Sequence, residues 1–352
     1  MPLPDIDYRP LVPKTSLRIG VLGAGGIVRD AHLPAYRKAG FSLSAICDVR
    51  EDAAREAARR FGIDGVETDP RALVERQDVD VIDMAIPDAG RLEIVKAAVA
   101  AGKHLLIQKP LAHDIDVARE IVRIARDGKV FLAVNQNARW APEFRAVHSL
   151  IRGGHLGHVY LIHWEMRNWA DSQPWAKDSW YGTEEKFQIL MWTIHHLDLV
   201  RYWMGEEPVR LYASLPTRPE QNMRGDVVSS VVMDFAGGQH ANVLDNNASL
   251  VGRDVHQYFG IEGTRGLVEG DVAKTDPIVV RLAAEPYAVF RPPLEGQWYP
   301  DGFIGSMGDL LDAIEKGRSP EVTGEDHIGT LQLVTAAYAS AAEGRAVAPS
   351  DY

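Results

Sequence analysis

The sequence of 352 residues contains a single cysteine, Cys47. One cysteine excludes an internal disulfide framework and is typical of a reducing compartment. No apolar run approaches the roughly 20 residues that a membrane-spanning helix needs. The first 16 residues contain four prolines but lack the apolar core of a secretion signal, so we interpret them as an extended arm. We therefore expect a cytoplasmic protein without a membrane partner.

Basic residues are also in the minority, because 38 Lys and Arg stand against 49 Asp and Glu and give a formal net charge of −11. This acidic balance argues against nonspecific binding to nucleic acid or to anionic membranes. His and acidic residues do not gather at the spacing of metal ligands, so we predict no metal. A hydrophobic fraction of 46% is that of an ordinary globular protein, and the length is sufficient for two domains.

Short apolar runs alternate with helix-forming segments over residues 17–137. The predicted strands cover residues 17–23, 42–48, 79–86, 104–108 and 130–135. Such alternation is typical of parallel β-α-β units with right-handed crossovers. Ligands bind beyond the carboxyl ends of the strands in such sheets. The residues at or just past these ends are Gly23, Asp48, Pro87, Lys109 and Gln136.

A glycine-rich turn, Gly23-Ala24-Gly25-Gly26-Ile27-Val28, lies between the first predicted strand and its helix. The glycines permit a tight turn and a close approach of backbone N–H groups to a pyrophosphate, at a helix N-terminus that favours negative charge. Val28 stands where Gly or Ala usually eases the packing of helix on strand.

Asp48, at the end of the second strand, is able to accept hydrogen bonds from ribose hydroxyls and would repel a 2′-phosphate. We predict NAD as the cofactor rather than NADP, although Arg50 could soften this preference. The predicted cofactor contacts are Gly23, Gly25, Gly26, Ile27, Asp48, Arg50, Ile86, Pro87, Gln108, Lys109 and Gln136.

The segment Gln108-Lys109-Pro110 resembles the Gfo/Idh/MocA family of sugar and polyol oxidoreductases, which carry Glu-Lys-Pro at the end of the fifth strand. Further motifs of the family follow in order along the chain: GAGGIV, AHLPAY, AGKHLLIQKPLA, VNQNARW, FQILMWTIHHLDLVRYWMG and GEDHIGTLQLVTAAYASAAEG. The resemblance implies a Rossmann domain over residues 17–137 and an α+β domain over residues 138–352. It also implies an open, mostly antiparallel sheet in the second domain, whose exposed face forms a homodimer or homotetramer.

The second half of the sequence agrees with this expectation. Segments with strand character cover residues 159–169, 209–215, 227–235, 240–245, 256–260 and 278–282. Helices are predicted over residues 185–204, 304–316 and 325–343, and the last two could pack back on the first domain.

Two residues are the predicted catalytic groups, Lys109 and His195. An ammonium group beside the nicotinamide is able to hydrogen-bond the reacting hydroxyl and to relay its proton. A histidine with a pKa near neutrality is suited to act as a general base. The plainer interpretations are an exposed strand-end lysine and a hydrogen-bonded core histidine.

Four positions depart from the family pattern. Gln108 replaces a Glu, Met191 and Thr193 replace the Asp and Gly of Asp-x-Gly-x-His-x-x-Asp, and Arg91 stands where the family often has His. Fewer carboxylates near Lys109 should lower its pKa relative to family members, because an opposite charge favours the protonated form. A neutral lysine could itself accept a proton.

Tryptophans interleaved with polar groups over residues 164–180 indicate a surface for sugar rings, since aromatic faces stack on their C–H faces. The alternative for any one indole is packing in the core. Arg139 could bind an anionic substrate group or hold the two domains together. The predicted substrate contacts are Lys109, Asn137, Arg139, Trp164, Arg167, Trp175, Met191, Trp192, His195 and His196.

These features predict an NAD-dependent oxidoreductase that moves a hydride between nicotinamide and a secondary hydroxyl or keto group of a sugar, glycoside or cyclic polyol. One alternative is an NAD-dependent, redox-neutral glycosidase that works by oxidation and elimination. Another is a non-catalytic sensor of NAD or sugar.

Overall fold

The computed structural model describes residues 4–250, 255–274, 277–283 and 288–352. The chain divides into two compact units. The Rossmann unit comprises residues 9–142 and 296–328, and the large-sheet unit comprises residues 1–8, 143–295 and 329–352. Helix α10 (Gly324–Glu343) begins in the first unit and ends in the second.

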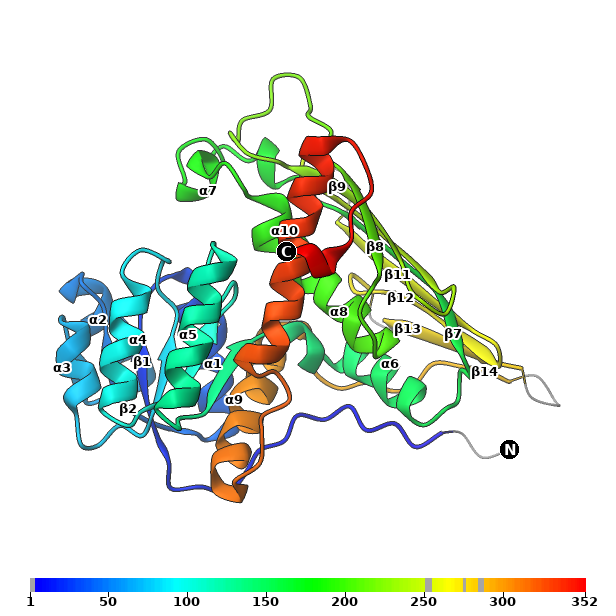
Figure 1. The fold of residues 1–352 in the computed structure, drawn as a ribbon. Helices are drawn as coiled ribbons and strands as arrows, with labels where there is room; N and C mark the ends of the chain where they lie inside the picture. The colour runs from blue at the N-terminus through cyan, green and yellow to red at the C-terminus, as the bar shows by residue number, and fades with distance from the viewer. Residues whose placement is uncertain (1–3, 251–254, 275–276, 284–287) are drawn as a thin grey trace. The chain divides into compact units, whose positions relative to one another are not determined.

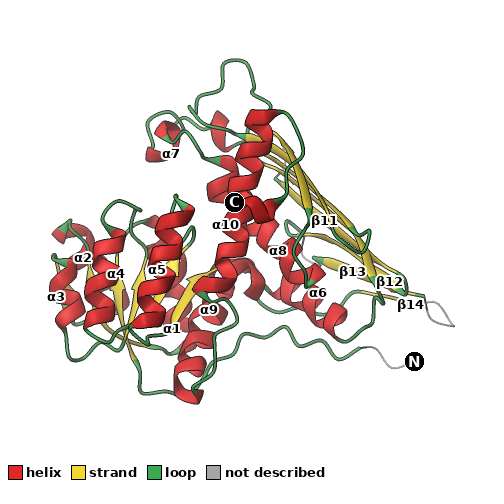
Figure 2. Ribbon diagram, viewed as in Figure 1, coloured by secondary structure: helices red, strands yellow, loops and turns green. Residues whose placement is uncertain are grey.

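The Rossmann unit is built on a parallel sheet of six strands in the order β3-β2-β1-β4-β5-β6 (Figures 1 and 2). Its strands are β1 (Arg18–Leu22), β2 (Ser42–Cys47), β3 (Gly65–Glu67), β4 (Val81–Met84), β5 (His104–Gln108) and β6 (Leu132–Asn135). Its helices are η1 (Val28–His32), α1 (Leu33–Ala39), α2 (Glu51–Phe61), α3 (Pro70–Glu75), α4 (Arg91–Ala100), α5 (Ile115–Asp127), η2 (Asn137–Trp140) and α9 (Trp298–Lys316). The strand order reverses between β1 and β4, which is where such sheets bind their ligands.

Local sequence explains these helices well. In α2 the four alanines at 53, 54, 57 and 58 face the core, and Gly62 ends the helix with a φ of +63°. Helix α5 begins at Asp114, whose carboxylate accepts hydrogen bonds from the amides of Asp116 and Val117. Helix α9, although distant in sequence, contributes Phe303 and Met307 to the same core as β1.

The large-sheet unit contains eight strands in the order β14-β13-β12-β11-β7-β10-β9-β8. They are β7 (Val159–Arg167), β8 (Arg210–Ser214), β9 (Val228–Asp234), β10 (His240–Asn246), β11 (His256–Gly263), β12 (Gly266–Asp271), β13 (Ile278–Leu282) and β14 (Ala288–Phe290). Neighbouring strands are antiparallel except β7 and β10, which are parallel. The remaining helices are α6 (Pro142–Arg152), η3 (Ala170–Ser172), α7 (Trp180–Thr183), η4 (Gln188–Thr193), α8 (Ile194–Met204) and η5 (Pro349–Asp351).

The predicted fold class, a Rossmann sheet followed by an α+β unit with a mostly antiparallel sheet, is confirmed. Strands β3, β12 and β14 escaped prediction because β3 and β14 have three residues each and β12 contains two glycines. Among the described residues, no helix combines the length and hydropathy needed to cross a membrane.

The single helix predicted over residues 185–204 is wrong at its start. A π-helical segment, η4, precedes α8, which begins at Ile194. The carboxylate of Asp226 accepts hydrogen bonds from the amides of Phe187 (2.7 Å) and Ile189 (3.0 Å). This distant carboxylate satisfies amides at the start of η4, where no preceding helical turn provides carbonyl acceptors.

Strand β7 alternates between the two faces of the large sheet, so that Ile162, Trp164 and Met166 are buried. Trp164 is 1% exposed and lies 5.4 Å from Phe144 and 5.7 Å from Phe259 between ring centroids. An indole enclosed in this way has no free face for a sugar. Trp164 therefore packs in the core, which is the alternative interpretation given for any one indole.

Replacing Trp164 by alanine should destabilise the protein by about 3–5 kcal/mol, because it removes a large buried ring. Trp175, which is 47% exposed, provides the control, and Trp175→Ala should change stability by no more than roughly 0.5 kcal/mol. Urea unfolding followed by circular dichroism measures both. Equal midpoints for the two variants would contradict the assignment of Trp164 to the core.

Candidate nucleotide and substrate site

Gly23 ends β1 in a conformation that other residues rarely adopt, with a φ of +107°. Its amide donates to the carbonyl of Cys47 at 2.7 Å. A Cβ at this position would lie 2.4 Å from the carbonyl oxygen of Ala85, which follows β4. Glycine is therefore required both by the turn and by the close approach of two neighbouring strand exits.

The rest of the glycine turn is open. A Cβ built on Gly25 would meet no protein atom within 4 Å, and Gly26 and Ile27 are exposed. The turn leads directly into η1, so free backbone N–H groups lie at a helix start. This cradle fits a dinucleotide pyrophosphate.

Asp48 lies directly after β2 and is joined to the same turn. Its Oδ2 accepts a hydrogen bond from the amide of Ala24 at 2.7 Å, and its Oδ1 accepts one from the amide of Arg50 at 2.9 Å. The side chain of Arg50 is 63% exposed and lies 3.8 Å from the same carboxylate. The structure thus brings the glycine turn and the predicted ribose-binding acid together.

Lys109 follows β5 and is half-buried. Burial lowers the pKa of its ammonium group to about 8. The side chain of Gln108 folds back, and its Oε1 accepts a hydrogen bond from the Lys109 amide at 3.1 Å. Of the predicted contacts at the neighbouring β4 exit, Ile86 is half-buried and Pro87 is exposed. A lysine with a pKa near 8 is suited to exchange a proton at neutral pH.

The predicted residues after β6 are buried and have partners within the Rossmann unit. Gln136 lies 3.5 Å from His327, and Asn137 Oδ1 accepts a hydrogen bond from the Trp298 indole at 2.6 Å. Arg139, 4% exposed, donates to Asp326 at 2.7 Å. A carboxylate of the same unit therefore already pairs with this arginine.

In the large-sheet unit, α8 carries His195 and His196, both buried. The Nδ1 of His196 lies 2.7 Å from a carboxylate oxygen of Asp245, and its ring stacks on Trp164 at 4.1 Å. Asp245 was not among the predicted site residues. It lies in β10, within the strand predicted over residues 240–245.

Two departures from the family pattern lie just before α8. Met191 packs in an apolar cluster with Phe187 and Met223, and Trp192 packs against this cluster, partly buried. The hydroxyl of Thr193 lies 2.9 Å from that of Ser229. Met191 therefore packs among apolar side chains at a position where the family pattern has a carboxylate.

Arg167 points to the opposite face of the large sheet from Trp164, because they lie three residues apart on β7. It forms an ion pair with Glu165 on the open face, which α8 does not cover. Arg167 therefore lies on the opposite face of the sheet from His196, and its assignment to the substrate contacts stays a prediction. Trp175 and Trp180 are exposed on the segment that follows β7.

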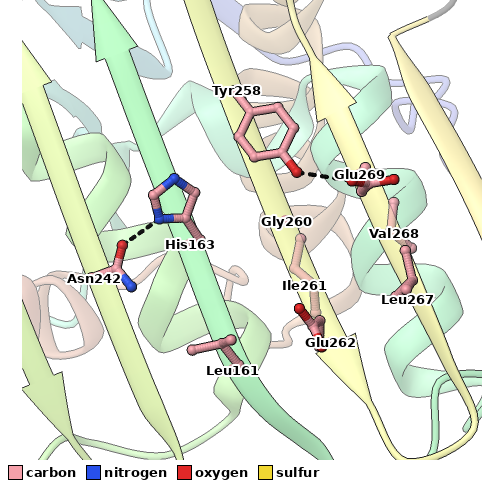
Figure 3. A pocket seen from close by; sticks show the side chains of 10 residues that line it. All are labelled: Leu161, His163, Asn242, Tyr258, Gly260, Ile261, Glu262, Leu267, Val268 and Glu269. Carbon is pink, nitrogen blue, oxygen red and sulfur yellow. Dashed lines mark hydrogen bonds between the residues drawn. The ribbon is translucent and has the colours of Figure 1, made fainter.

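The open face of the large sheet contains a hollow of about 320 Å³ (Figure 3). Figure 3 shows His163 and Asn242 hydrogen-bonded on one side of the hollow and Tyr258 donating to Glu269 on the other, with Gly260 between them. None of the predicted site residues lines this hollow. Within the described ranges, no group of three or more His, Cys, Asp or Glu could hold a metal ion.

Comparison with known proteins gives consistent matches along the chain. Residues 17–136 match the model of an oxidoreductase family with an NAD-binding Rossmann fold, and residues 144–269 match the GFO/IDH/MocA C-terminal domain. Inositol 2-dehydrogenase of Rhizobium meliloti is 28% identical over 94% of this chain and 99% of its own. D-apiose dehydrogenase of Paraburkholderia graminis is 27% identical over 93% and 88%.

The fold is also found in solved structures. An oxidoreductase from Agrobacterium radiobacter, in complex with NAD+, L-tartaric acid and magnesium, superposes with a TM-score of 0.86 over 96% of this chain and 99% of its own, at 22% identity. The two family models confirm the predicted family resemblance and the NAD-binding Rossmann domain.

Gly25→Ala should weaken NAD binding while leaving the NAD-free protein as stable as before, because the added Cβ meets no protein atom. Loss of one hydrogen bond to a charged pyrophosphate costs about 1.5–3 kcal/mol, or roughly tenfold or more in Kd. Titration calorimetry and thermal unfolding measure the two effects. Unchanged affinity would show that the pyrophosphate does not lie against this residue.

Asp48→Ala should shift the ratio of NADP to NAD affinity towards NADP by about tenfold, since it removes the charge that repels a 2′-phosphate. The ratio is informative because loss of the Ala24 hydrogen bond affects both cofactors alike. Kd values for the two cofactors on wild type and variant provide the measurement. A constant ratio would refute the role of Asp48 in cofactor preference.

Proposed function

Because the chain belongs to the Gfo/Idh/MocA family of oxidoreductases, we propose that it is an NAD-dependent dehydrogenase or reductase of a sugar, glycoside or cyclic polyol. The relatives described above act on inositol, a cyclic polyol, and on apiose, a sugar. The observation that carries the proposal is a half-buried lysine with a lowered pKa at the exit of β5, in the unit that holds the glycine turn.

Lys109 moves the proton of the reacting hydroxyl in this proposal. When bound, NAD supplies the hydride acceptor for the carbon that bears this hydroxyl. The amine of Lys109 accepts the hydroxyl proton during oxidation, and the ammonium returns it during reduction. A pKa of about 8 keeps both forms accessible near neutral pH, so the same side chain serves either direction.

Other predicted residues have supporting roles. Asp48 binds the adenosine ribose, and the amides of the glycine turn bind the pyrophosphate. His195 is the second proton-handling group, on the grounds of its register in the family motif and its position in α8. The adjacent residue, His196, has its ring held in one orientation by a buried hydrogen bond to Asp245.

The proposed reaction is tested by incubating the protein with NAD and a panel of sugars, polyols and aryl glycosides, while following NADH and released aglycone. Accumulation of NADH supports the dehydrogenase. Aglycone release without NADH would replace it with the redox-neutral glycosidase, and NAD binding without turnover of any compound would favour a sensor.

Lys109→Met should lower kcat by about 10²–10⁴-fold, the usual contribution of a positioned proton-transfer group, with the Kd for NAD changed by no more than roughly twofold. In the wild type, kcat/KM for oxidation should rise with pH and level off above about 8, because only the neutral amine accepts a proton. Steady-state kinetics from acidic to alkaline pH measure this profile. A profile of the same shape in Lys109→Met would remove Lys109 from the mechanism.

The open face of the large sheet is the proposed surface for a homodimer or homotetramer. Helices α6 and α8 lie against the other face of the sheet (Figure 1), whereas the open face carries Leu161, Tyr258 and the hollow at Gly260. A cytoplasmic location is also proposed, since the one cysteine, Cys47, is a buried free thiol that suits a reducing compartment.

Gly260→Arg should lower the molar mass measured by light scattering, because it places a charged side chain on the proposed interface. The position tolerates a side chain, since the nearest atom to a Cβ is the Tyr258 hydroxyl at 3.4 Å. Ser42→Arg, at the exposed start of β2, is the control and should leave the mass unchanged. A wild type that is monomeric, or an oligomer unaffected by Gly260→Arg, would contradict this interface.

A further inference from the structure

The guanidinium group of Arg91 is buried and donates hydrogen bonds to three backbone carbonyls. Arg91 is the first residue of α4 and is 4% exposed. Its Nη1 donates to Pro110 at 2.6 Å and to Leu111 at 2.8 Å, and its Nη2 donates to Ile86 at 2.5 Å. One side chain thus connects two stretches of backbone that are more than 20 residues apart in sequence.

These carbonyls belong to two adjacent strand exits. Pro110 and Leu111 directly follow Lys109, which leaves β5, and Ile86 lies just beyond the end of β4. The peptide of Leu111 has a second partner as well, because its amide lies 3.4 Å from Nε2 of His327. The backbone on the carboxyl side of Lys109 is therefore held through both its N–H and its C=O groups.

Burying a guanidinium group is costly unless its donors are satisfied. Here the two Nη atoms donate to three carbonyl oxygens, the buried Nε has no hydrogen-bond partner among the described residues, and the nearest acid, Asp88, lies 3.8 Å from Nη1. A buried salt bridge with ideal geometry would use a carboxylate for those donors. Both donating nitrogens are instead used to fix backbone positions at the place where Lys109 emerges.

We propose that Arg91 is a positioning residue that fixes Lys109 by clamping the backbone of residues 110 and 111 to the exit of β4. The proposal rests on the role of Lys109 proposed above. A lysine amine stays desolvated only while its backbone keeps it in place, so loosening of the clamp admits water and restores the ordinary titration of the side chain. Misplacement of the amine by about 1 Å would also slow proton transfer by roughly 100-fold.

The titration of Lys109 in the full-length protein tests the clamp without substrate. Competitive acetylation with acetic anhydride over a range of pH, read by mass spectrometry of the peptide that contains Lys109, gives the midpoint. The wild type should titrate near 8, Arg91→Gln should move the midpoint upward by roughly one unit or more, and Arg91→Lys should lie between them. The control Arg55→Gln, on the exposed face of α2 beside Glu51, should titrate like the wild type.

Steady-state kinetics of the same variants provide a second test of the clamp. Arg91→Gln should lower kcat by about 10- to 100-fold, with the Kd for NAD within roughly twofold, and should shift the rising limb of the pH profile as the acetylation midpoint shifts. If Arg91 had only a structural role, its replacement would lower the thermal stability and leave the rising limb of the pH profile of kcat/KM at the same pH. Arg91→Lys keeps a cation that can reach a carbonyl, so it tests the clamp if Arg91→Gln does not fold.

Two outcomes overturn the clamp: an unchanged Lys109 midpoint in folded Arg91→Gln or Arg91→Lys, or an unchanged kcat with an unchanged pH limb. Failure of the proposed function is recognised separately, as full turnover by Lys109→Met. The acetylation midpoint still decides the clamp in that case, because it is measured without substrate.

Discussion

The close approach of Gly23 to the carbonyl of Ala85 is the contact on which the nucleotide half of the site depends. It joins the exits of β1 and β4, the two strands between which the sheet order reverses. Because no side chain lies between these strand ends, the amides of the turn are free to point outward, and Asp48 accepts a hydrogen bond from the Ala24 amide. The exit of β5 is then tied to the exit of β4 by Arg91. Three adjacent strand ends are thus held in one arrangement by backbone contacts and by one guanidinium group.

The chemistry proposed for Lys109 follows from its surroundings more than from its identity. An exposed lysine at neutral pH is almost entirely protonated and would be a poor base. Burial at the exit of β5 lowers its pKa, so a larger fraction of the amine is neutral at physiological pH. The sequence comparison with the family suggested missing carboxylates as the cause of a lowered pKa, whereas burial is the cause that the structure shows.

Much of the fold was predictable because its signals are local. The apolar run of β1, the glycines after it and the alanine face of α2 are contiguous in sequence and need no distant partner. The start of η4, which precedes α8, was not predictable, because Asp226 accepts its hydrogen bonds from more than 30 residues away. The same holds for Arg139, whose partner Asp326 is 187 residues distant. Composition also does not distinguish Trp164 from Trp175: the alternation of β7 within a sheet buries Trp164, whereas Trp175 lies on the segment after this strand and is exposed.

The parallel pairing of β7 with β10 has a consequence for the two segments that leave their common edge. Parallel strands end at the same edge, so the segments after Arg167 and after Asn246 leave the sheet together and bond to each other, as in the 2.7 Å hydrogen bond from the Asn168 amide to the Asn246 carbonyl. The exposed tryptophans lie on one of these segments, whereas the two histidines are carried by α8. The two segments hold each other in place, since the Asp171 amide donates to the Asn247 carbonyl at 3.0 Å and the Ser249 amide donates to the Asn168 carbonyl at 3.1 Å. A change in the length or sequence of one segment therefore affects the other.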